Sequence, residues 1–217
     1  TAVQYIDTAM VGTLGTQATA AVGATSTVSW VIGSSTSALG IGFLSFIARA
    51  YGAGSREEAK RASAQAALVV LMIGTLFTVL CLSCAKLIPV WMQVDETIRP
   101  LTAQYFAILY SPMLFRTATT VFGMVLRAAG DTKTPMKVGV GVNIMNVVLN
   151  FLLIYPTRRI RILGLRIPMI GAGWGVVGAA VASAAAFAVG GIWITVVLWR
   201  HPAISPKGQT FKPDMEI

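Results

Sequence analysis

The sequence predicts an all-α integral membrane protein, a polytopic helix bundle with about six transmembrane helices of which the first is truncated. Hydrophobic residues make up 55% of the 217 residues and charged residues only 12%, whereas a soluble domain carries roughly 25% charged residues. The mean hydropathy is +0.73. The apolar residues come in blocks of at least the ~20 residues that a bilayer core about 30 Å thick requires. A soluble enzyme, a secreted disulfide scaffold and a disordered chain are therefore disfavoured.

Six apolar blocks define the expected helices. The first looks like the end of a helix whose beginning is missing, because neither an initiator Met nor a signal peptide precedes it. The other five are each long enough to cross a membrane. Together they form an expected transmembrane domain over residues 1–200, with helices over about 1–12, 20–48, 59–85, 101–126, 136–155 and 170–199.

Short polar segments connect these blocks. Gly52–Glu58 offers a glycine turn, a serine N-cap and carboxylates at a helix start. Gly130–Pro135 offers the same features, with proline in the first helical turn. Pro112, inside the fourth block, is expected to kink that helix or free a carbonyl group. Residues 201–217 are polar, contain three prolines and are expected to form a loop that leads elsewhere.

The Lys and Arg residues near the helix ends predict the orientation, because the loops richest in these residues stay in the cytoplasm. Ten fall on one side and six on the other. The richer side is expected to be cytoplasmic, together with the loop 201–217, in a multi-pass protein of the plasma (inner) membrane. The ten are Arg49, Arg56, Lys60, Arg61, Arg127, Lys133, Lys137, Arg200, Lys207 and Lys212, and the six are Lys86, Arg99, Arg158, Arg159, Arg161 and Arg166.

Three features that suggest other functions have simpler explanations here. The net charge of +9 follows from membrane topology, so no nucleic-acid partner is expected. Cys81 and Cys84 lie inside an apolar run without further ligands, so no metal or redox site is expected. Gly173–Gly178 matches a nucleotide-binding pattern but lacks the preceding strand and the following acid. The protein is expected not to be an enzyme and to need no cofactor.

Asp7 is the acidic residue that the sequence places inside an apolar block. A carboxylate at membrane depth costs roughly 2.5–3.5 kcal/mol. Such a residue can exchange a proton or hold a cation, so Asp7 is a candidate functional residue. The alternative is that Asp7 lies near the helix end and is simply solvated.

Three asparagines form the second polar feature. Asn143, Asn146 and Asn150 are spaced so that their side chains share one face of the fifth helix. This face should look into the protein or into a wet cavity, because hydrocarbon offers amides no partners. A polar seam between helices is the alternative. Ser183 and Thr120 are expected to contribute to the same interior.

Arg116 is a cation at an unexpected depth. It lies eleven residues before Arg127, which is ~16 Å along a helix at 1.5 Å per residue. Arg116 is therefore expected near the middle of the membrane, where it would pair with an acid or bind an anionic group of a substrate.

Five motifs, in this order, resemble those of the multidrug and toxic compound extrusion (MATE) transporters. Asp7–Gly15 is similar to the signature that closes their first helix, and Gly52–Ala59 to the loop between helices two and three. Arg127–Met136 resembles the loop before helix five. Asn143–Asn150 resembles the polar motif of helix five, and Gly178–Ser183 the start of helix six. The motifs extend over almost the whole chain.

The resemblance implies one lobe of a twelve-helix transporter that exports cationic drugs or metabolites in exchange for Na⁺ or H⁺. Asp7 falls on the coupling aspartate of the family, and Asn146 on the helix-five asparagine of that site. Asn150 falls where some members carry a second aspartate. Ser183 replaces the usual threonine and keeps its hydroxyl, and Thr120 is near a polar position of helix four. The complete protein is expected to be monomeric.

Two other functions remain open from the sequence. A lipid-linked-oligosaccharide flippase of the same superfamily would use Arg116 for an anionic headgroup, but it does not need the Asp7 motif. A passive membrane scaffold would use the buried polar residues only to pack helices. Either Na⁺ or H⁺ fits the residues at Asp7.

Overall fold

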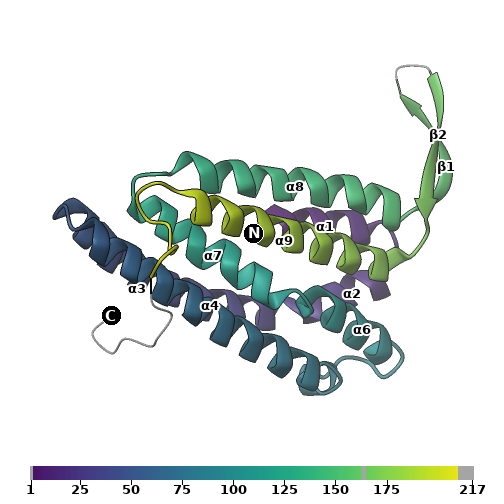
Figure 1. The fold of residues 1–217 in the computed structure, drawn as a ribbon. Coiled ribbons are helices and arrows are strands. Elements are labelled where there is room, and N and C mark those ends of the chain that lie inside the picture. Colours follow the sequence, from purple (N-terminus) through teal and green to yellow (C-terminus); the bar gives the residue numbers. More distant parts are fainter. Residues whose placement is uncertain (1, 163–164, 210–217) are drawn as a thin grey trace. The chain divides into compact units, whose positions relative to one another are not determined.

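The computed structural model describes residues 2–162 and 165–209, which form nine helices and two strands (Figure 1). The tail expected over 201–217 is thus described as far as Gln209, and its residues 210–217 lie outside the described part. In chain order the elements are α1 (Ala2–Gly12), α2 (Thr16–Ala24), α3 (Ser26–Gly52), α4 (Arg56–Cys84), α5 (Ile88–Trp91), α6 (Arg99–Tyr110), α7 (Met113–Ala128), α8 (Lys133–Leu153), β1 (Pro156–Ile162), β2 (Leu165–Ala172) and α9 (Gly175–Arg200).

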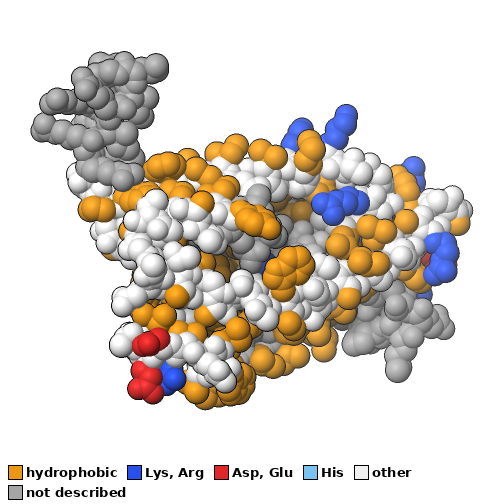
Figure 2. Space-filling model, turned by 180° about the vertical axis from the view of Figure 1, so that it is seen from behind, with side chains coloured by type: hydrophobic (Ala, Val, Ile, Leu, Met, Phe, Trp, Pro, Cys, Tyr) orange, Lys and Arg blue, Asp and Glu red, His pale blue; other side chains and the backbone are white. Residues whose placement is uncertain are grey.

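Four helical segments of the described chain are long and apolar enough to cross a membrane. They are Thr16–Gly52, which joins α2 and α3, Arg56–Cys84, Lys133–Leu153 and Gly175–Arg200. Large apolar side chains remain exposed on all four, and Figure 2 shows apolar side chains spread over much of the face in view. Such a surface is stable in hydrocarbon and not in water. The prediction of a helical membrane protein is confirmed.

The helix predicted over 101–126 is interrupted at Pro112, the residue that was expected to disturb it. Residues Ser111 and Pro112 separate α6 from α7. The ring of a proline blocks the carbonyl group four residues earlier, which here belongs to Ile108, and proline has no N–H to donate. The Ile108 oxygen instead accepts the Ser111 amide at 3.3 Å and the Ser111 hydroxyl at 2.8 Å.

An antiparallel β-hairpin follows α8, where the sequence predicted only a loop. Strand β1 pairs with β2 from Pro156 opposite Ala172 to Ile162 opposite Leu165. The last helix therefore begins at Gly175 rather than near residue 170, because residues 170–172 belong to β2. Gly173 and Gly175 have φ of +69° and +54°, a left-handed conformation that glycine adopts without a steric penalty. These two residues turn the chain from the strand into the helix.

The chain divides into two compact units. The first comprises Thr1–Ser29, Leu80–Pro112 and Val142–Ala186, and the second comprises Trp30–Val79, Met113–Gly141 and Phe187–Ile217. In the first unit α1 lies beside the C-terminal part of α8 and the N-terminal part of α9 (Figure 1).

The second unit is built around α7, which packs closely on α4 and α9. A Cβ added at Gly74 of α4 would lie 2.8 Å from Leu114 Cδ1, and one at Gly191 of α9 would lie 2.5 Å from Phe115 Cβ. The absence of side chains at these two glycines therefore lets the helices of this unit approach α7.

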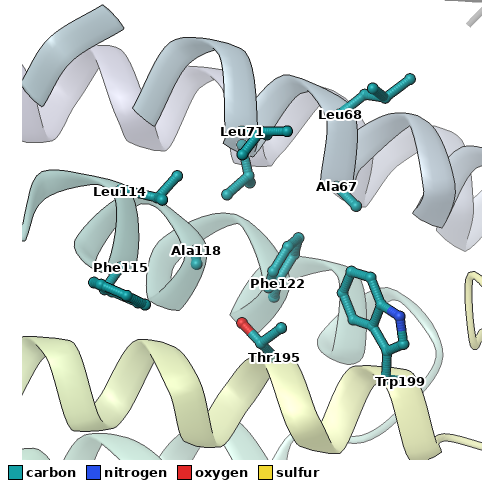
Figure 3. A pocket seen from close by; sticks show the side chains of 10 residues that line it. Ala67, Leu68, Leu71, Leu114, Phe115, Ala118, Phe122, Thr195 and Trp199 are labelled. Atoms are coloured by element: carbon teal, nitrogen blue, oxygen red, sulfur yellow. The ribbon is translucent and has the colours of Figure 1, made fainter. Parts of the chain in front are cut away.

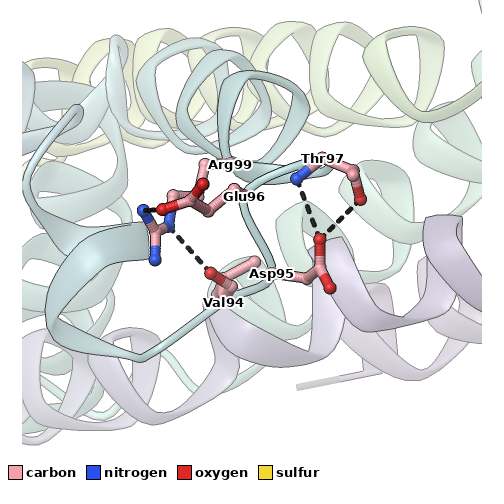
Figure 4. Close-up of polar contacts among 5 residues, drawn as sticks. All are labelled: Val94, Asp95, Glu96, Thr97 and Arg99. Atoms are coloured by element: carbon pink, nitrogen blue, oxygen red, sulfur yellow. Dashed lines mark hydrogen bonds and ion pairs between the residues drawn. The ribbon is translucent and has the colours of Figure 1, made fainter.

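The connection between α5 and α6 is fixed by its own hydrogen bonds (Figure 4). The hydroxyl and the amide of Thr97 donate to Asp95 Oδ1 at 2.7 and 2.9 Å. The Arg99 side chain donates to the Val94 carbonyl at 2.8 Å and pairs with Glu96 at 3.0 Å. The bonds from Thr97, the hydroxyl first, hold the pKa of Asp95 below its usual value. This turn sets where α6 begins.

Candidate functional site

The junction between α8 and α9 determines which of their residues meet. Backbone amides of Gly173, Trp174 and Gly175 donate to the carbonyls of Tyr155, Leu153 and Ile154 at 2.8–3.1 Å. These bonds start α9 against the end of α8, and α9 then runs back along α8.

The register of this antiparallel pair places two polar residues opposite each other. Ser183 lies eight residues after Gly175, and Asn146 lies eight residues before Ile154. Because Gly175 donates to the Ile154 carbonyl, equal steps along both helices bring Ser183 beside Asn146, ~12 Å from the junction at 1.5 Å per residue. The Asn146 amide donates to Ser183 Oγ at 2.8 Å.

Asp7 of α1 completes a buried cluster with these residues. Its Oδ1 atom accepts the side-chain amides of Asn150 at 2.7 Å and Asn146 at 3.1 Å. Its Oδ2 atom accepts the hydroxyl of Ser183. Asn150 also donates to Asn146 Oδ1 at 3.2 Å. Asp7 is 2% exposed and the other three residues are 0% exposed, so the cluster is an interior polar site formed by three helices.

The cluster offers a buried carboxylate at which a proton or a cation can bind. Its three side-chain donors stabilise the charged form, whereas burial favours the neutral form. The Oδ1 atom of Asn150 is buried and has no hydrogen-bond partner among the described residues. A buried unpaired acceptor is costly, and this oxygen lies in the same side chain that contacts Asp7. Carboxylate and carbonyl oxygens are ligands that hard cations prefer. The same oxygens can also accept a hydrogen bond from a proton donor.

The Tyr155 hydroxyl connects α1 to the end of α8, a contact that was not predicted from the sequence. The Tyr155 hydroxyl donates to the Met10 carbonyl at 3.2 Å and lies 3.0 Å from Thr13 Oγ1. Thr13 in turn donates to the Met10 carbonyl at 2.7 Å. Met10 lies three residues after Asp7, so this contact helps to position the helix that carries the carboxylate. The sequence feature that could have indicated this contact is the tyrosine at the end of the apolar block that contains the asparagines.

The remaining predicted site residues lie elsewhere. Asn143 is half-buried, and among the described residues it takes no part in the hydrogen bonds around Asp7. Thr120 belongs to the second unit, where its hydroxyl donates to the Arg116 carbonyl at 3.2 Å. The Arg116 guanidinium, also in the second unit, lies 5.0 Å from the centre of the Phe187 ring, a cation–π contact.

The two cysteines form no disulfide within the part of the chain that the structure describes. Cys81 is buried and Cys84 is half-buried. Within residues 2–162 and 165–209, no three His, Cys, Asp or Glu side chains gather where they could hold a metal ion.

The chain belongs to the MatE family, whose model matches residues 1–152. Members of this family are transporters and not enzymes. The chain is 28% identical over 195 residues to the probable multidrug resistance protein NorM of Thermotoga maritima, covering 90% of this chain and 40% of that protein. It is 37% identical over 87 residues to multidrug and toxin extrusion protein 1 of Oryctolagus cuniculus, covering 40% of this chain and 15% of that protein. The chain thus spans less than half the length of these relatives.

Solved structures of MATE proteins share the fold. A MATE in the bent conformation superposes with a TM-score of 0.87 at 26% identity, over 99% of this chain and 45% of that one. The inward-facing conformation of a multidrug resistance MATE family transporter gives a TM-score of 0.86 at 26% identity, over 99% and 46% of the two chains. A transporter of the same superfamily from Pyrococcus furiosus, described as having reversed polarity in its binding pocket, gives 0.85 at 26% identity, over 99% and 44%. The expected family and helical membrane fold are both confirmed.

Proposed function

We propose that the complete protein is a secondary active efflux transporter that exchanges Na⁺ or H⁺ for organic cations or metabolites by alternating access. The observation that carries this proposal is the buried Asp7 carboxylate, which accepts Asn146, Asn150 and Ser183 beside an unpaired Asn150 oxygen. The names of the relatives, which refer to multidrug resistance and toxin extrusion, support the class of substrate. The substrate is a small molecule, and the bilayer surrounds a monomer.

Coupling follows from the way the cluster joins three helices. A proton or Na⁺ at Asp7 removes or shares the charge that the two amides and the hydroxyl now satisfy, so these donors must rearrange. Since the donors sit on α8 and α9 and the carboxylate on α1, ion occupancy changes the energy of one arrangement of these helices relative to another. A ligand shifts such an equilibrium only through its differential affinity for the two states. Ion and substrate then oppose each other by linkage.

A gradient experiment with the complete protein tests the proposal. Drug-sensitive cells are de-energised and loaded with a fluorescent organic cation, and a proton or sodium gradient is then imposed. We expect gradient-driven efflux from the native protein and none from Asp7→Asn. The asparagine keeps the shape of the side chain, and the Ser183 hydroxyl can turn to accept its amide, so the variant should still fold. Efflux from Asp7→Asn at the native rate under both gradients would refute the proposal.

Ser183 offers a matched pair of control variants. Ser183→Thr keeps the hydroxyl that donates to Asp7 Oδ2, whereas Ser183→Ala removes it. We expect Ser183→Thr to retain efflux and Ser183→Ala to require more coupling ion for the same rate. The absence of efflux from well-expressed native protein under either gradient would instead favour the flippase function, and Arg116→Gln would be the next variant.

A further inference from the structure

The second unit contains an apolar groove of about 280 Å³ between α4, α7 and α9 (Figure 3). Leu68 and Leu71 of α4 form one wall, and Trp199 of α9 forms part of the other. Phe115 and Phe122 of α7 lie between them. The rings of Phe122 and Trp199 are 6.0 Å apart in an edge-to-face arrangement. Leu71 is 56% exposed, so the groove opens at the surface of the second unit.

The lining gives a polar ligand very little to bind. Thr195 contributes a hydroxyl, but this hydroxyl already donates to the Gly191 carbonyl at 2.6 Å. The other lining side chains are aliphatic or aromatic, apart from the indole N–H of Trp199. A groove with these walls on a membrane helix fits an alkyl chain, which forms dispersion contacts and needs no hydrogen bond.

Basic residues mark one end of this groove. Helix α7 runs toward this end from Phe115 to Phe122, and α9 runs toward it as it approaches Trp199 (Figure 3). Helix α4 runs the other way and starts at this end. Arg127 lies in the last turn of α7 and Arg200 ends α9 directly after Trp199. Phe122 is therefore only ~8 Å along the helix axis from Arg127 at 1.5 Å per residue.

The start of α4 adds further charge at the same end. Arg56, Lys60 and Arg61 lie in its first turns together with Glu57 and Glu58. Lys60 pairs with Glu57 at 2.9 Å. With Arg127 and Arg200 these helix ends carry five basic residues against the three acidic residues Glu57, Glu58 and Asp131, so their net charge is positive. Trp199 directly precedes Arg200 at the end of α9, and tryptophan favours the level of the lipid headgroups.

We propose that this groove binds one acyl chain of an anionic phospholipid, with the lipid phosphate held by Arg200 and Arg127. Apolar walls accept the chain, and the basic helix ends select the headgroup, because each basic residue near the surface attracts anionic lipid. The positive-inside rule places this lipid in the cytoplasmic leaflet. The site is independent of Asp7, so it stands or falls separately from the coupling mechanism.

Quenching of Trp199 fluorescence by brominated lipid tests this proposal. The complete protein is reconstituted in phosphatidylcholine vesicles that contain increasing fractions of phosphatidylglycerol, with bromine on the acyl chains of one lipid or the other. The Trp199→Phe variant supplies the signal of the remaining tryptophans, which is subtracted. We expect brominated phosphatidylglycerol to quench Trp199 saturably, at a several-fold lower mole fraction than brominated phosphatidylcholine.

Charge variants separate selective binding from general contact with lipid. We expect Arg200→Gln to weaken the preference for phosphatidylglycerol by about fivefold, the effect of one basic residue near the surface. Lys137→Gln removes an exposed charge from α8, a helix that does not line the groove, and should leave the preference unchanged. Equal quenching by the two lipids would overturn the proposal, because it indicates unselective contact. Absence of quenching by either lipid would also overturn it, since another part of the protein would then fill the groove.

Discussion

Asn150 donates its side-chain amide to Asp7 Oδ1 at 2.7 Å, although 143 residues separate the two in sequence. The same amide reaches Asn146 Oδ1 at 3.2 Å. One side chain of α8 thus satisfies an acceptor of α1 and an acceptor of its own helix, and all three residues are buried. This hydrogen bond therefore links the position of α1 to that of α8. An ion that competes with Asn150 for Asp7 acts on this link between the two helices.

Replacing Asn150 by leucine should destabilise the protein as well as impair coupling. The change removes two donors from buried acceptors, one of them a carboxylate, and such a loss costs about 1–3 kcal/mol, with charged groups at the upper end. We expect Asn150→Leu to lower the midpoint of thermal unfolding of the purified complete protein. Val148→Ala is the control, because Val148 is 51% exposed on the same helix, and it should change stability by less than ~0.5 kcal/mol. Equal midpoints for the native protein and Asn150→Leu would show that these bonds contribute nothing.

The helical membrane fold could be predicted because it depends on composition and block length alone. The interruption after Tyr110 was also foreseeable, since Pro112 must disturb any helix that contains it. The hairpin was not, because a basic segment such as Arg158–Arg166 is typical of an exposed loop, and its strands pair through the backbone. Arg159–Ile162 and Leu165–Ile167 do alternate basic and apolar residues, as strands can, but the alternation is short and the charge of the segment favoured a loop.

Part of the candidate site could also be predicted from the sequence, because it depends on spacing along one helix. Helical spacing places Asn146 and Asn150 on one face, and their contact with Asp7 follows once that face is buried. The same spacing places Asn143 on this face as well. Asn143 takes no part in the cluster, because the face extends further along the helix than one carboxylate can reach. The position of Ser183 depends on where α9 begins, and the glycine turn at Gly173–Gly175 sets that start. Periodicity cannot supply such a register.

Gly178 is a close-approach position whose substitution should loosen the α8–α9 pair. A Cβ added there would lie 2.5 Å from the Leu153 carbonyl oxygen and 3.0 Å from the Ile154 nitrogen, both backbone atoms that cannot move aside. We expect Gly178→Ala to lower the unfolding midpoint and to weaken the response to the coupling ion, because Ser183 follows on the same helix. Gly139→Ala is the matched control, since its Cβ would meet nothing within 4 Å. It should be neutral or stabilising by about 0.5–1 kcal/mol. Native behaviour of Gly178→Ala would argue against this packing.

His201 should make the segment after α9 sensitive to acid. Burial lowers the pKa of His201 below its usual value of 6.5, and the Asp131 carboxylate offsets this only in part. The Ala203 amide donates to His201 Nδ1 at 3.3 Å, which requires the neutral ring. The unfolded state then binds more protons than the folded state as the pH falls through 6.5, so this contribution to stability is present above that pH and is lost below it.

Hydrogen exchange of residues 201–209 measures this effect. We expect exchange in the native protein to accelerate below about pH 6.5, relative to His201→Gln at the same pH, because glutamine carries no charge that acid can add. Using the variant at each pH cancels the intrinsic dependence of exchange on pH. Parallel profiles for the two proteins between pH 5 and 7.5 would contradict the expectation.

Tyr155 should act on the coupling ion through α1 without touching it. Its hydroxyl donates to the Met10 carbonyl at 3.2 Å beside Thr13 Oγ1, and a hydrogen bond of this kind contributes about 0.5–1.5 kcal/mol. In Tyr155→Phe the end of α1 loses this tie, so Asp7 is held less well. We expect the ion concentration for half-maximal efflux to rise by about two- to tenfold, while the maximal rate changes little. Tyr5→Phe, which removes an exposed hydroxyl from α1 itself, should leave both quantities unchanged.

Combining Tyr155→Phe with Thr13→Val tests whether the two hydroxyls act as one unit. Both reach the Met10 carbonyl, Thr13 at 2.7 Å and Tyr155 at 3.2 Å. Residues in one hydrogen-bond network give non-additive effects, so the double variant should require scarcely more ion than the more affected single variant. Additive effects would mean that the two side chains influence α1 separately. A fall in maximal rate with an unchanged ion requirement would mean that Tyr155 serves a later step of transport rather than the position of Asp7.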